Sequence, residues 1–451
     1  MRKEIDMNTQ ILTNKGVVQG IQEDGYVLFK GIPYAKPPIG DLRWKRPEET
    51  ECWDGVYMAD TWPSMCMQIL PSPDNPMMGP YHAEFYSNPE FMPPMSEDCL
   101  YLNIWMPDHK DGEKLPVAFW IHGGGFGGGF SSEVEFDGEA YAKRGVMLVS
   151  VAYRTNIFGF FAHPWLDKEN EEGISGNYGI YDQLMALNWV YENIEAFGGD
   201  KDNITIFGQS AGAMSTQIMV SSELTGNIPA KAILQSGITC DCKFLYTPTL
   251  KEEEEIGEMF VSISGAESIE ELRKIPAEEI LKLKVKLDPK LWQLGKGLVL
   301  VPNVDGVVLK ETVGEAYRNG YMKKIPYICG IVTDDLASTP EEIKEKKTGI
   351  LMEDCKQWAL KMEELGQNTY VYHFNHDVPG EGCPAFHSSE IWYTFGTIGR
   401  NILPMTEEDY VLSDKIVDMW TDFMKYGSPD PDGSYEWKAY RKMDPYIKVF
   451  E

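Results

Sequence analysis

The pentapeptide Gly208–Gly212, which reads GQSAG, constrains the fold of this chain more than any other feature. The run Ile204–Phe207 before it has the apolar, β-branched character of a strand, and residues 211–220 after it have a helical pattern. A serine at such a sharp turn has strained backbone angles, and glycines beside it avoid collisions with neighbouring elements. The turn also exposes the hydroxyl near unpaired N–H groups at the helix start. Ser210 is therefore predicted to be a nucleophile.

Segments of strand character alternate with segments of helical period along much of the chain. Val117–Ile121 and residues 146–151 are short apolar runs, whereas Tyr181–Asn193 repeats its apolar residues with a helical period. Such alternation predicts an α/β fold, with a mostly parallel central sheet flanked by helices. Together with the strand–turn–helix serine it indicates an α/β-hydrolase, formed by residues 1–451 as a single domain.

Two stretches interrupt this alternation. Residues 62–95 are rich in Pro, Met and aromatic side chains without a clear period, and residues 240–324 are charged and mostly helical in pattern. We expect both to be loop and helical insertions on the sheet core that form the rim of the active site.

A second glycine cluster, His122–Phe126, follows the predicted strand at 117–121. Consecutive glycines let the backbone approach a substrate closely and point N–H groups toward it. Such donors stabilise the oxyanion of a tetrahedral intermediate, and losing one typically costs ~3 kcal/mol of transition-state stabilisation. We assign the oxyanion hole to the N–H groups of Gly124, Gly125 and Ala211.

Two other kinds of site find less support. Gly123, Gly125 and Gly128 have the spacing of a dinucleotide-binding motif, but the residues after them lack the helical period that this motif requires. His373 and His376 could suggest a metal site, but no cluster of cysteines or carboxylates accompanies them. We therefore expect no metal and no cofactor.

The serine needs a general base, and in this fold the chain order is nucleophile, acid, histidine. Three histidines lie downstream of Ser210: His373, His376 and His387. The first falls in an alternating strand pattern, which is typical of a histidine within a sheet. His387 lies in a predicted loop before an aromatic helix start, where a catalytic residue is expected.

The acid should lie between the nucleophile and His387, at the end of a strand. Asp334 and Asp335 both follow the apolar run 327–332 and both fit this position. A buried carboxylate there would hold the imidazole in the right tautomer and stabilise the imidazolium. Position alone does not choose between the two aspartates.

Several further segments carry a resemblance to a known family. They are Gly31–Ala35 with Pro37 and Pro38, Glu97–Ile104, Gly176–Gly179 with Asp182 and Gln183, Phe197–Asp200, and Pro302 with Asp305 and Gly306. With the serine and histidine motifs, they resemble the type-B carboxylesterases, which include cholinesterases and bacterial para-nitrobenzyl esterases. The resemblance extends over most of the chain.

The resemblance implies a triad of serine, acid and histidine. Aligned through Gly330, the family's acid falls on Asp335, where an aspartate replaces the usual glutamate and Leu336 replaces the usual glycine after it. Gln209 replaces the glutamate common before the nucleophile, which removes a charge there. Glu390 matches a glutamate that supports the histidine region in relatives, and a solvated loop charge is an equally good reading.

Two cysteines fall where relatives have a disulfide. Cys66 and Cys99 match a bridge that closes a loop at the rim in secreted relatives. A reducing cytosol would keep both as free thiols, so their state is expected to depend on redox conditions.

The motifs and the resemblance imply a serine carboxylesterase that forms an acyl-enzyme on Ser210. We expect Phe126 and Gln209 to contact the substrate, and the aromatic insertions favour an apolar or aryl ester. An amidase or thioesterase with the same triad stays open, because specificity lies in the pocket. A non-catalytic binding protein on this fold is a further alternative, but such relatives typically lose the serine or the histidine.

Charge and hydropathy bear on partners and location. The formal net charge of −29 repels phosphate backbones and anionic lipid headgroups, so neither nucleic acid nor a membrane surface is expected as a partner. No uncharged apolar run approaches the roughly 18 residues of a membrane span, and the start of the sequence has no signal-peptide pattern. We expect a cytoplasmic monomer or weak homo-oligomer whose partner is a small-molecule ester.

Overall fold

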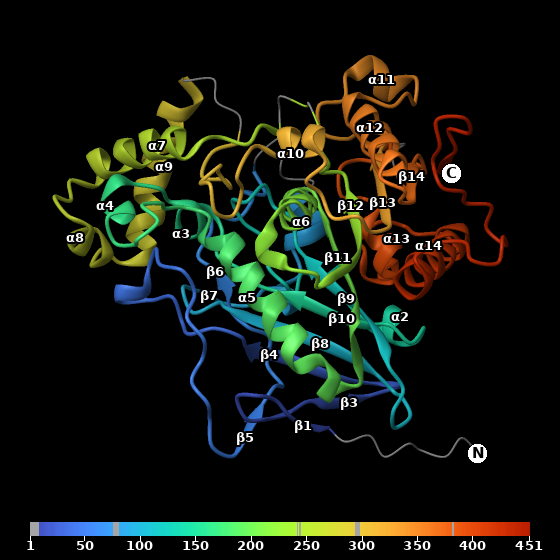
Figure 1. The fold of residues 1–451 in the computed structure, drawn as a ribbon, viewed down its shortest axis with the longest axis horizontal. Helices are drawn as coiled ribbons and strands as arrows, with labels where there is room; N and C mark the ends of the chain where they lie inside the picture. Colours follow the sequence, from blue (N-terminus) through green and yellow to red (C-terminus); the bar gives the residue numbers. More distant parts are fainter. Residues whose placement is uncertain (1–8, 75–80, 241, 243–244, 294–297, 381–382) are drawn as a thin grey trace.

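The computed structural model describes residues 9–451, apart from 75–80, 241, 243–244, 294–297 and 381–382. Its centre is a ten-stranded sheet (Figure 1). In order across the sheet, the strands are β15 (Ile447–Phe450), β14 (Thr369–Phe374), β13 (Tyr327–Val332), β12 (Pro229–Gln235), β11 (Gly199–Gln209), β9 (Leu115–Ile121), β10 (Met147–Val151), β8 (Tyr101–Pro107), β4 (Tyr26–Pro33) and β3 (Ile21–Glu23). Neighbours are parallel from β15 to β10, whereas β8, β4 and β3 pair antiparallel.

The parallel strands are buried on both faces. Every residue of β10, β13 and β14 is buried. Burial on both faces explains why the sequences of β10 and β13 are short apolar runs rather than alternating patterns. The predicted strands at 117–121, 146–151 and 204–207 are confirmed as β9, β10 and part of β11. The mostly parallel sheet agrees with the predicted α/β fold.

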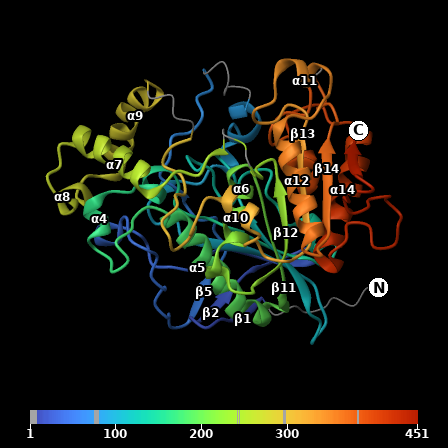
Figure 2. The ribbon, with the colours of Figure 1, turned by 45° about the horizontal axis from the view of Figure 1, so that its top comes forward.

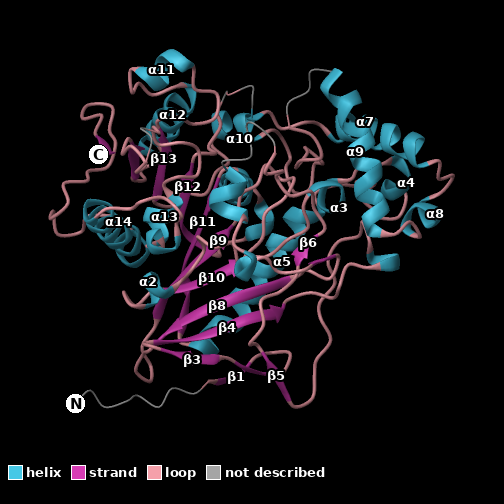
Figure 3. Cartoon of the chain, turned by 180° about the vertical axis from the view of Figure 1, so that it is seen from behind, coloured by secondary structure: helices cyan, strands magenta, loops and turns pink. Residues whose placement is uncertain are grey.

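Helices cover the two faces of the sheet (Figures 1 and 3). On one face lie α5 (Tyr178–Asn193), α6 (Ala211–Ser221), α10 (Val313–Asn319) and α12 (Ile350–Glu364), and on the other lie α2 (Glu139–Ala142), α13 (Ile391–Phe395) and α14 (Glu407–Tyr426). Each face has its own apolar core, with Trp358 in the first and Trp420 in the second. The predicted helices at 181–193 and 211–220 are confirmed as α5 and α6.

The two interrupting stretches differ in their structure. Within residues 62–95 the described elements are short: β6 (Met65–Cys66), a π-helical turn at His82–Tyr86, a 3-10 turn at Pro89–Phe91, and β7 (Met95–Ser96). Within 240–324 lie α7 (Leu250–Ser264), α8 (Ile269–Arg273) and α9 (Ala277–Gln293), which gather at one end of the molecule (Figure 2). α7 begins at a capping box of Thr249 and Glu252 and ends at Gly265, whose φ is 70°.

The remaining elements lie outside the ten-stranded sheet. They are β1 (Gln10–Leu12), β2 (Val17–Gln19) and β5 (Val56–Met58) in a small sheet, with η1 (Gly40–Leu42), α3 (Asn156–Phe160), α4 (Pro164–Asp167), η4 (Ile194–Phe197), η5 (Glu223–Thr225), α11 (Pro340–Lys344) and η7 (Ile398–Arg400). None of the helices within the described ranges has the length and apolar character needed to cross a bilayer. That residues 1–451 form a single domain stays a prediction.

Candidate active site

Ser210 alone forms the turn between β11 and α6. Its φ of 55° and ψ of −127° lie in a region that side chains rarely adopt, and its N–H donates to the carbonyl of Gln235 at 2.9 Å. A Cβ on Gly208 would overlap the backbone of Gly212, and a Cβ on Gly212 would overlap the carbonyl oxygen of Ile121. Both glycines are therefore required by close packing at this turn.

His387 and Asp335 form a hydrogen-bonded pair next to this turn. His387 Nδ1 lies 2.7 Å from Oδ1 of Asp335, whose side chain is 1% exposed. The N–H groups of Val332 and Leu336 donate to the same carboxylate at 3.1 and 2.8 Å. Burial alone would lower the pKa of His387, but the hydrogen bond to Asp335 and nearby carboxylates raise it above its ordinary value of 6.5.

The structure places Asp335, and not Asp334, against the imidazole. Asp334 acts through its backbone: its N–H donates to the carbonyl of Ala385 at 2.7 Å, and its carbonyl accepts from the N–H of His387 at 2.9 Å. These two bonds join the loop after β13 to the loop that carries the histidine. Burial and the charge of Asp335 raise the pKa of the Asp334 carboxyl.

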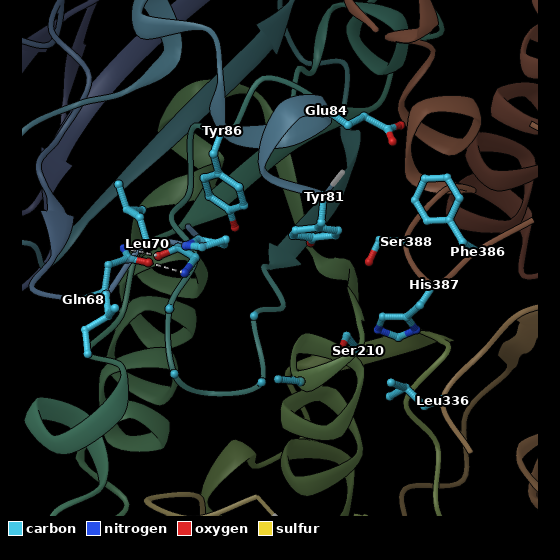
Figure 4. A pocket seen from close by; sticks show the side chains of 18 of the residues that line it. Gln68, Leu70, Tyr81, Glu84, Tyr86, Ser210, Leu336, Phe386, His387 and Ser388 are labelled. Carbon is cyan, nitrogen blue, oxygen red and sulfur yellow. Dashed lines mark hydrogen bonds between the residues drawn. The ribbon is translucent and has the colours of Figure 1, made fainter. Parts of the chain in front are cut away.

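The other ring nitrogen of His387 faces the turn at Ser210. Because Asp335 accepts from Nδ1, we assign the neutral ring a lone pair on Nε2. The amide Nε2 of Gln209 lies 3.4 Å from this atom and is oriented to donate to it. Ser210 and His387 line one cavity and lie beside each other in Figure 4.

The glycine loop, residues 122–129 after β9, borders the same cavity. Gly124 and Gly125 have φ values of 102° and 61°, which favour glycine, and a Cβ on Gly124 would overlap the carbonyl of Gly128. Within the described part of the chain, the N–H groups of Gly124, Gly125 and Ala211 have no acceptor. All three residues line the cavity beside Ser210. These donors are available to a bound group.

The cavity has a volume of about 1410 Å³, and most of its wall is apolar. Both interrupting stretches contribute to the wall: Leu70, Tyr81 and Tyr86 come from the first, and Leu281 and Leu298 from the second. Leu336 and Phe386 complete it near the histidine (Figure 4). The site thus combines a polar centre with a wide apolar enclosure.

The structure does not place Phe126 or Gln209 on the cavity wall. Phe126 is fully buried beneath the glycine loop, where its ring packs edge-on against Phe160 at 5.2 Å between centroids. Burying an apolar ring in the core is more favourable than exposing it beside a polar centre, so the loop turns it inward. Gln209 is also buried and reaches His387 instead.

The other histidines have partners of their own. His373 lies in β14, as expected for a sheet histidine, with Nε2 at 3.1 Å from the hydroxyl of Thr333, and burial lowers its pKa to about 4. His376 pairs with Asp409 at 2.7 Å. Among the described residues, no group of three or more His, Cys, Asp and Glu side chains is placed to hold a metal ion.

Glu390 is fully buried close to Asp335 and His387, so the interpretation as a solvated loop charge is wrong. The hydroxyl of Ser236 donates to its Oε1 at 3.4 Å. Burial first, and then the charge of Asp335, raise the pKa of Glu390 to about 7. Cys66 and Cys99 are both buried and are free thiols in this structure.

The polar residues on the cavity wall that sequence reasoning missed include Gln68 and Asn156. Both side chains bond to the backbone of the glycine loop. No local pattern marks them, because their partners lie 61 and 29 positions away.

Comparison with known proteins gives one consistent result. The family model described as "Carboxylesterase family" matches residues 7–354 and 348–450. The chain is 32% identical to a para-nitrobenzyl esterase of Bacillus subtilis (strain 168), over 97% of this chain and 94% of the relative. It is 31% identical to a fumonisin B1 esterase of Sphingopyxis macrogoltabida, over 95% and 84% of the two chains.

Solved structures agree with this result. A PNB esterase superimposes with a TM-score of 0.83 at 28% identity, covering 99% of this chain and 96% of the other. A carboxylesterase of Geobacillus stearothermophilus superimposes with a TM-score of 0.80 at 30% identity, covering 98% and 96%.

Proposed function

We propose, from the premise that the chain belongs to the carboxylesterase family and is a type-B carboxylic ester hydrolase with the α/β-hydrolase fold, that Ser210 is its nucleophile. The observation that carries this proposal is the juxtaposition of three features in one cavity. They are the strained serine turn, the imidazole held by Asp335 at 2.7 Å, and three N–H groups without an acceptor within the described chain.

In the acylation step, His387 Nε2 takes the proton of Ser210 as the hydroxyl oxygen attacks the ester carbonyl. Negative charge develops on the carbonyl oxygen, where the N–H groups of Gly124, Gly125 and Ala211 donate to it. The imidazolium then gives its proton to the departing alkoxide. An alcohol leaves, and the acyl group stays on the serine as an ester.

Deacylation repeats these steps with water as the nucleophile. His387 removes a proton from the water, the same donors hold the second oxyanion, and the serine leaves with the proton returned. Asp335 keeps Nδ1 protonated throughout and stabilises the imidazolium in both steps. Its three hydrogen bonds fix this shorter carboxylate in place where relatives use glutamate.

The cavity supports an apolar or aryl ester as the substrate class. Its wall includes Tyr81, Tyr86, Phe386 and Leu336, which can bury apolar groups of a bound ester. We propose a small-molecule ester of this kind as the partner. The cytoplasmic location and the state of monomer or weak homo-oligomer stay predictions.

The test measures hydrolysis of para-nitrophenyl acetate, butyrate and octanoate by the wild type and by Ser210→Ala. We expect turnover with an initial burst in the wild type and none in the variant, with kcat/KM rising with acyl length. Ser215→Ala is the matched control, since this buried hydroxyl on α6 accepts only from Gln183 among the hydrogen bonds of the described residues. A folded wild type without turnover would favour a binding role, and faster cleavage of matched anilides or thioesters would favour an amidase or thioesterase.

A further inference from the structure

The backbone of the glycine loop has unusual φ angles and few internal hydrogen bonds. Gly124, Gly125, Phe126 and Gly129 all have positive φ, at 102°, 61°, 60° and 97°. The loop belongs to no strand or helix, and its internal bonds run from the N–H groups of Gly127 and Gly128 to the carbonyl of Gly124, at 2.9 and 3.2 Å. A segment with such backbone angles and so few internal hydrogen bonds keeps its conformation only if residues outside the segment stabilise it.

Gln68 provides the first support. Its Oε1 accepts from the N–H of Gly129 at 2.7 Å, and its Nε2 donates to the carbonyl of the same residue at 3.1 Å. Nε2 also donates to the carbonyl of Cys66 at 3.2 Å. The side chain therefore forms hydrogen bonds with both the N–H and the carbonyl of Gly129, as a neighbouring β-strand would. Gln68 is 4% exposed, and Figure 4 shows it on the cavity wall.

Asn156 provides the second support, from the start of α3. Its Nδ2 donates to the carbonyl of Gly127 at 3.2 Å and to the carbonyl of Met67 at 2.8 Å, and its N–H donates to the carbonyl of Phe126 at 2.6 Å. Its φ is 46°, a conformation that asparagine tolerates better than most residues. The two amides therefore join the loop to one segment, Cys66–Gln68.

We propose that Gln68 and Asn156 are positioning residues, whose side-chain amides hold the glycine loop so that the N–H groups of Gly124 and Gly125 face the oxyanion formed at Ser210. This inference rests on the oxyanion hole proposed above. Neither side chain is assigned a contact with the reacting atoms, because each acts through the backbone that it holds.

A role in positioning has a specific kinetic signature. The oxyanion bonds strengthen only as the tetrahedral state forms, whereas the apolar wall binds the substrate beforehand. A loop displaced by a fraction of an ångström therefore loses bonds in the transition state and keeps the ground-state contacts. The expected change is a lower kcat with little change in KM.

The first variant is Gln68→Met, which keeps the side-chain length and removes the hydrogen bonds. Gln217 is a matched control, because it is 0% exposed and forms the same pair of hydrogen bonds with the backbone of Thr239. Its Oε1 accepts from the N–H of Thr239 at 3.0 Å, and its Nε2 donates to the carbonyl of that residue at 2.6 Å. Gln217→Met thus removes the same pair of bonds at a site away from the glycine loop.

We expect Gln68→Met to lower kcat about 10- to 100-fold on para-nitrophenyl butyrate, with KM within about threefold of the wild type. Gln217→Met should lower Tm similarly and keep kcat within about twofold, because distant sites act independently. A kcat loss equal in both variants, or a change confined to KM, would overturn the proposal.

A second measurement uses an aryl trifluoromethyl ketone. Its free ketone form, in equilibrium with the hydrate, is attacked by the oxygen of Ser210 while His387 takes the serine proton, which gives a hemiketal oxyanion. Its inhibition constant should rise by the factor by which kcat/KM falls. Asn156→Asp, which replaces the donor to Gly127 by a carboxylate oxygen, should show the same pattern and decides the question if Gln68→Met does not fold. An unchanged inhibition constant in a folded variant contradicts the inference. Turnover by Ser210→Ala in the same assay would instead refute the proposed function.

Discussion

Ser210, the proposed nucleophile, and His387, the proposed base, are held in different ways, although they line one cavity. Ser210 lies in a turn of a single residue between β11 and α6, where close packing at Gly208 and Gly212 leaves no room for a side chain. His387 lies in a loop that is hydrogen-bonded to the loop after β13. The backbone of Asp334 and the carboxylate of Asp335 make these hydrogen bonds. The first region depends on sterics and the second on hydrogen bonds.

This difference predicts how each region responds to substitution. Overlap of packed backbone atoms cannot be relieved without moving a strand, so a change at the nucleophile turn should abolish function outright. Hydrogen bonds between loops can be weakened one at a time, so changes near the histidine should give graded losses that depend on pH. The following predictions test this contrast.

The largest effect is expected at the turn itself. Gly212→Ala places a methyl group against the carbonyl of Ile121, so we expect no detectable esterase activity and a clearly lower Tm. Gly349→Ala is the control, because a Cβ there would meet only ordinary contacts at 3.5 Å or more. Wild-type turnover by Gly212→Ala would show that packing does not fix the turn.

Asp335→Asn tests the second region. The amide cannot stabilise the imidazolium as a carboxylate does, so kcat should fall by about 10³- to 10⁴-fold while Tm changes little. Asp334→Asn removes a neighbouring charge but keeps the backbone bonds, and it should retain most of the activity. A larger loss in Asp334→Asn than in Asp335→Asn would reverse the assignment of the acid.

Glu390, in the region of His387, should make the free energy of unfolding depend on pH. Its folded pKa of about 7 exceeds its ordinary value of 4.5, so the folded protein binds more protons between these values, and stability falls as pH rises through this window. Glu390→Gln removes this penalty, which is up to about 3 kcal/mol above pH 7. In urea unfolding, the free energy of unfolding of Glu390→Gln minus that of the wild type should be larger at pH 8 than at pH 4.5. An equal difference at both values would contradict the buried charge.

The smallest expected effect concerns His387, the proposed general base. His387 must be neutral to accept a proton, and its pKa is raised above 6.5. The profile of kcat/KM should therefore fall about tenfold per pH unit below a midpoint that lies above 6.5. In Asp335→Asn the residual activity should have its midpoint at lower pH, since a bond that raises the pKa is lost. An unchanged midpoint would indicate that another group sets the acid limb.

Local patterns in the sequence predicted the parts of the site that depend on neighbouring residues. The elements around Ser210 follow from periodicity and from the glycines on either side, and His373 was expected within a strand for the same reason. Phe126 was misplaced because the sequence does not show whether a loop turns a ring toward the core or the cavity. Gln68 and Asn156 act through long-range bonds, for which the local sequence has no signal.

The order of strands across the sheet has a consequence for biosynthesis. Gln209 and His387 are 178 positions apart in the chain, and β13 and β14 lie between them in sequence. At translation rates of ~5–20 residues per second, the ribosome needs about 10–35 s to reach the histidine after the nucleophile has been made. For the first part of that interval β12 has an unpaired edge, which β13 covers once it has been made. Until His387 has been made, the nascent chain lacks its proposed general base, and the open edge of β12 is a surface on which another strand could pair.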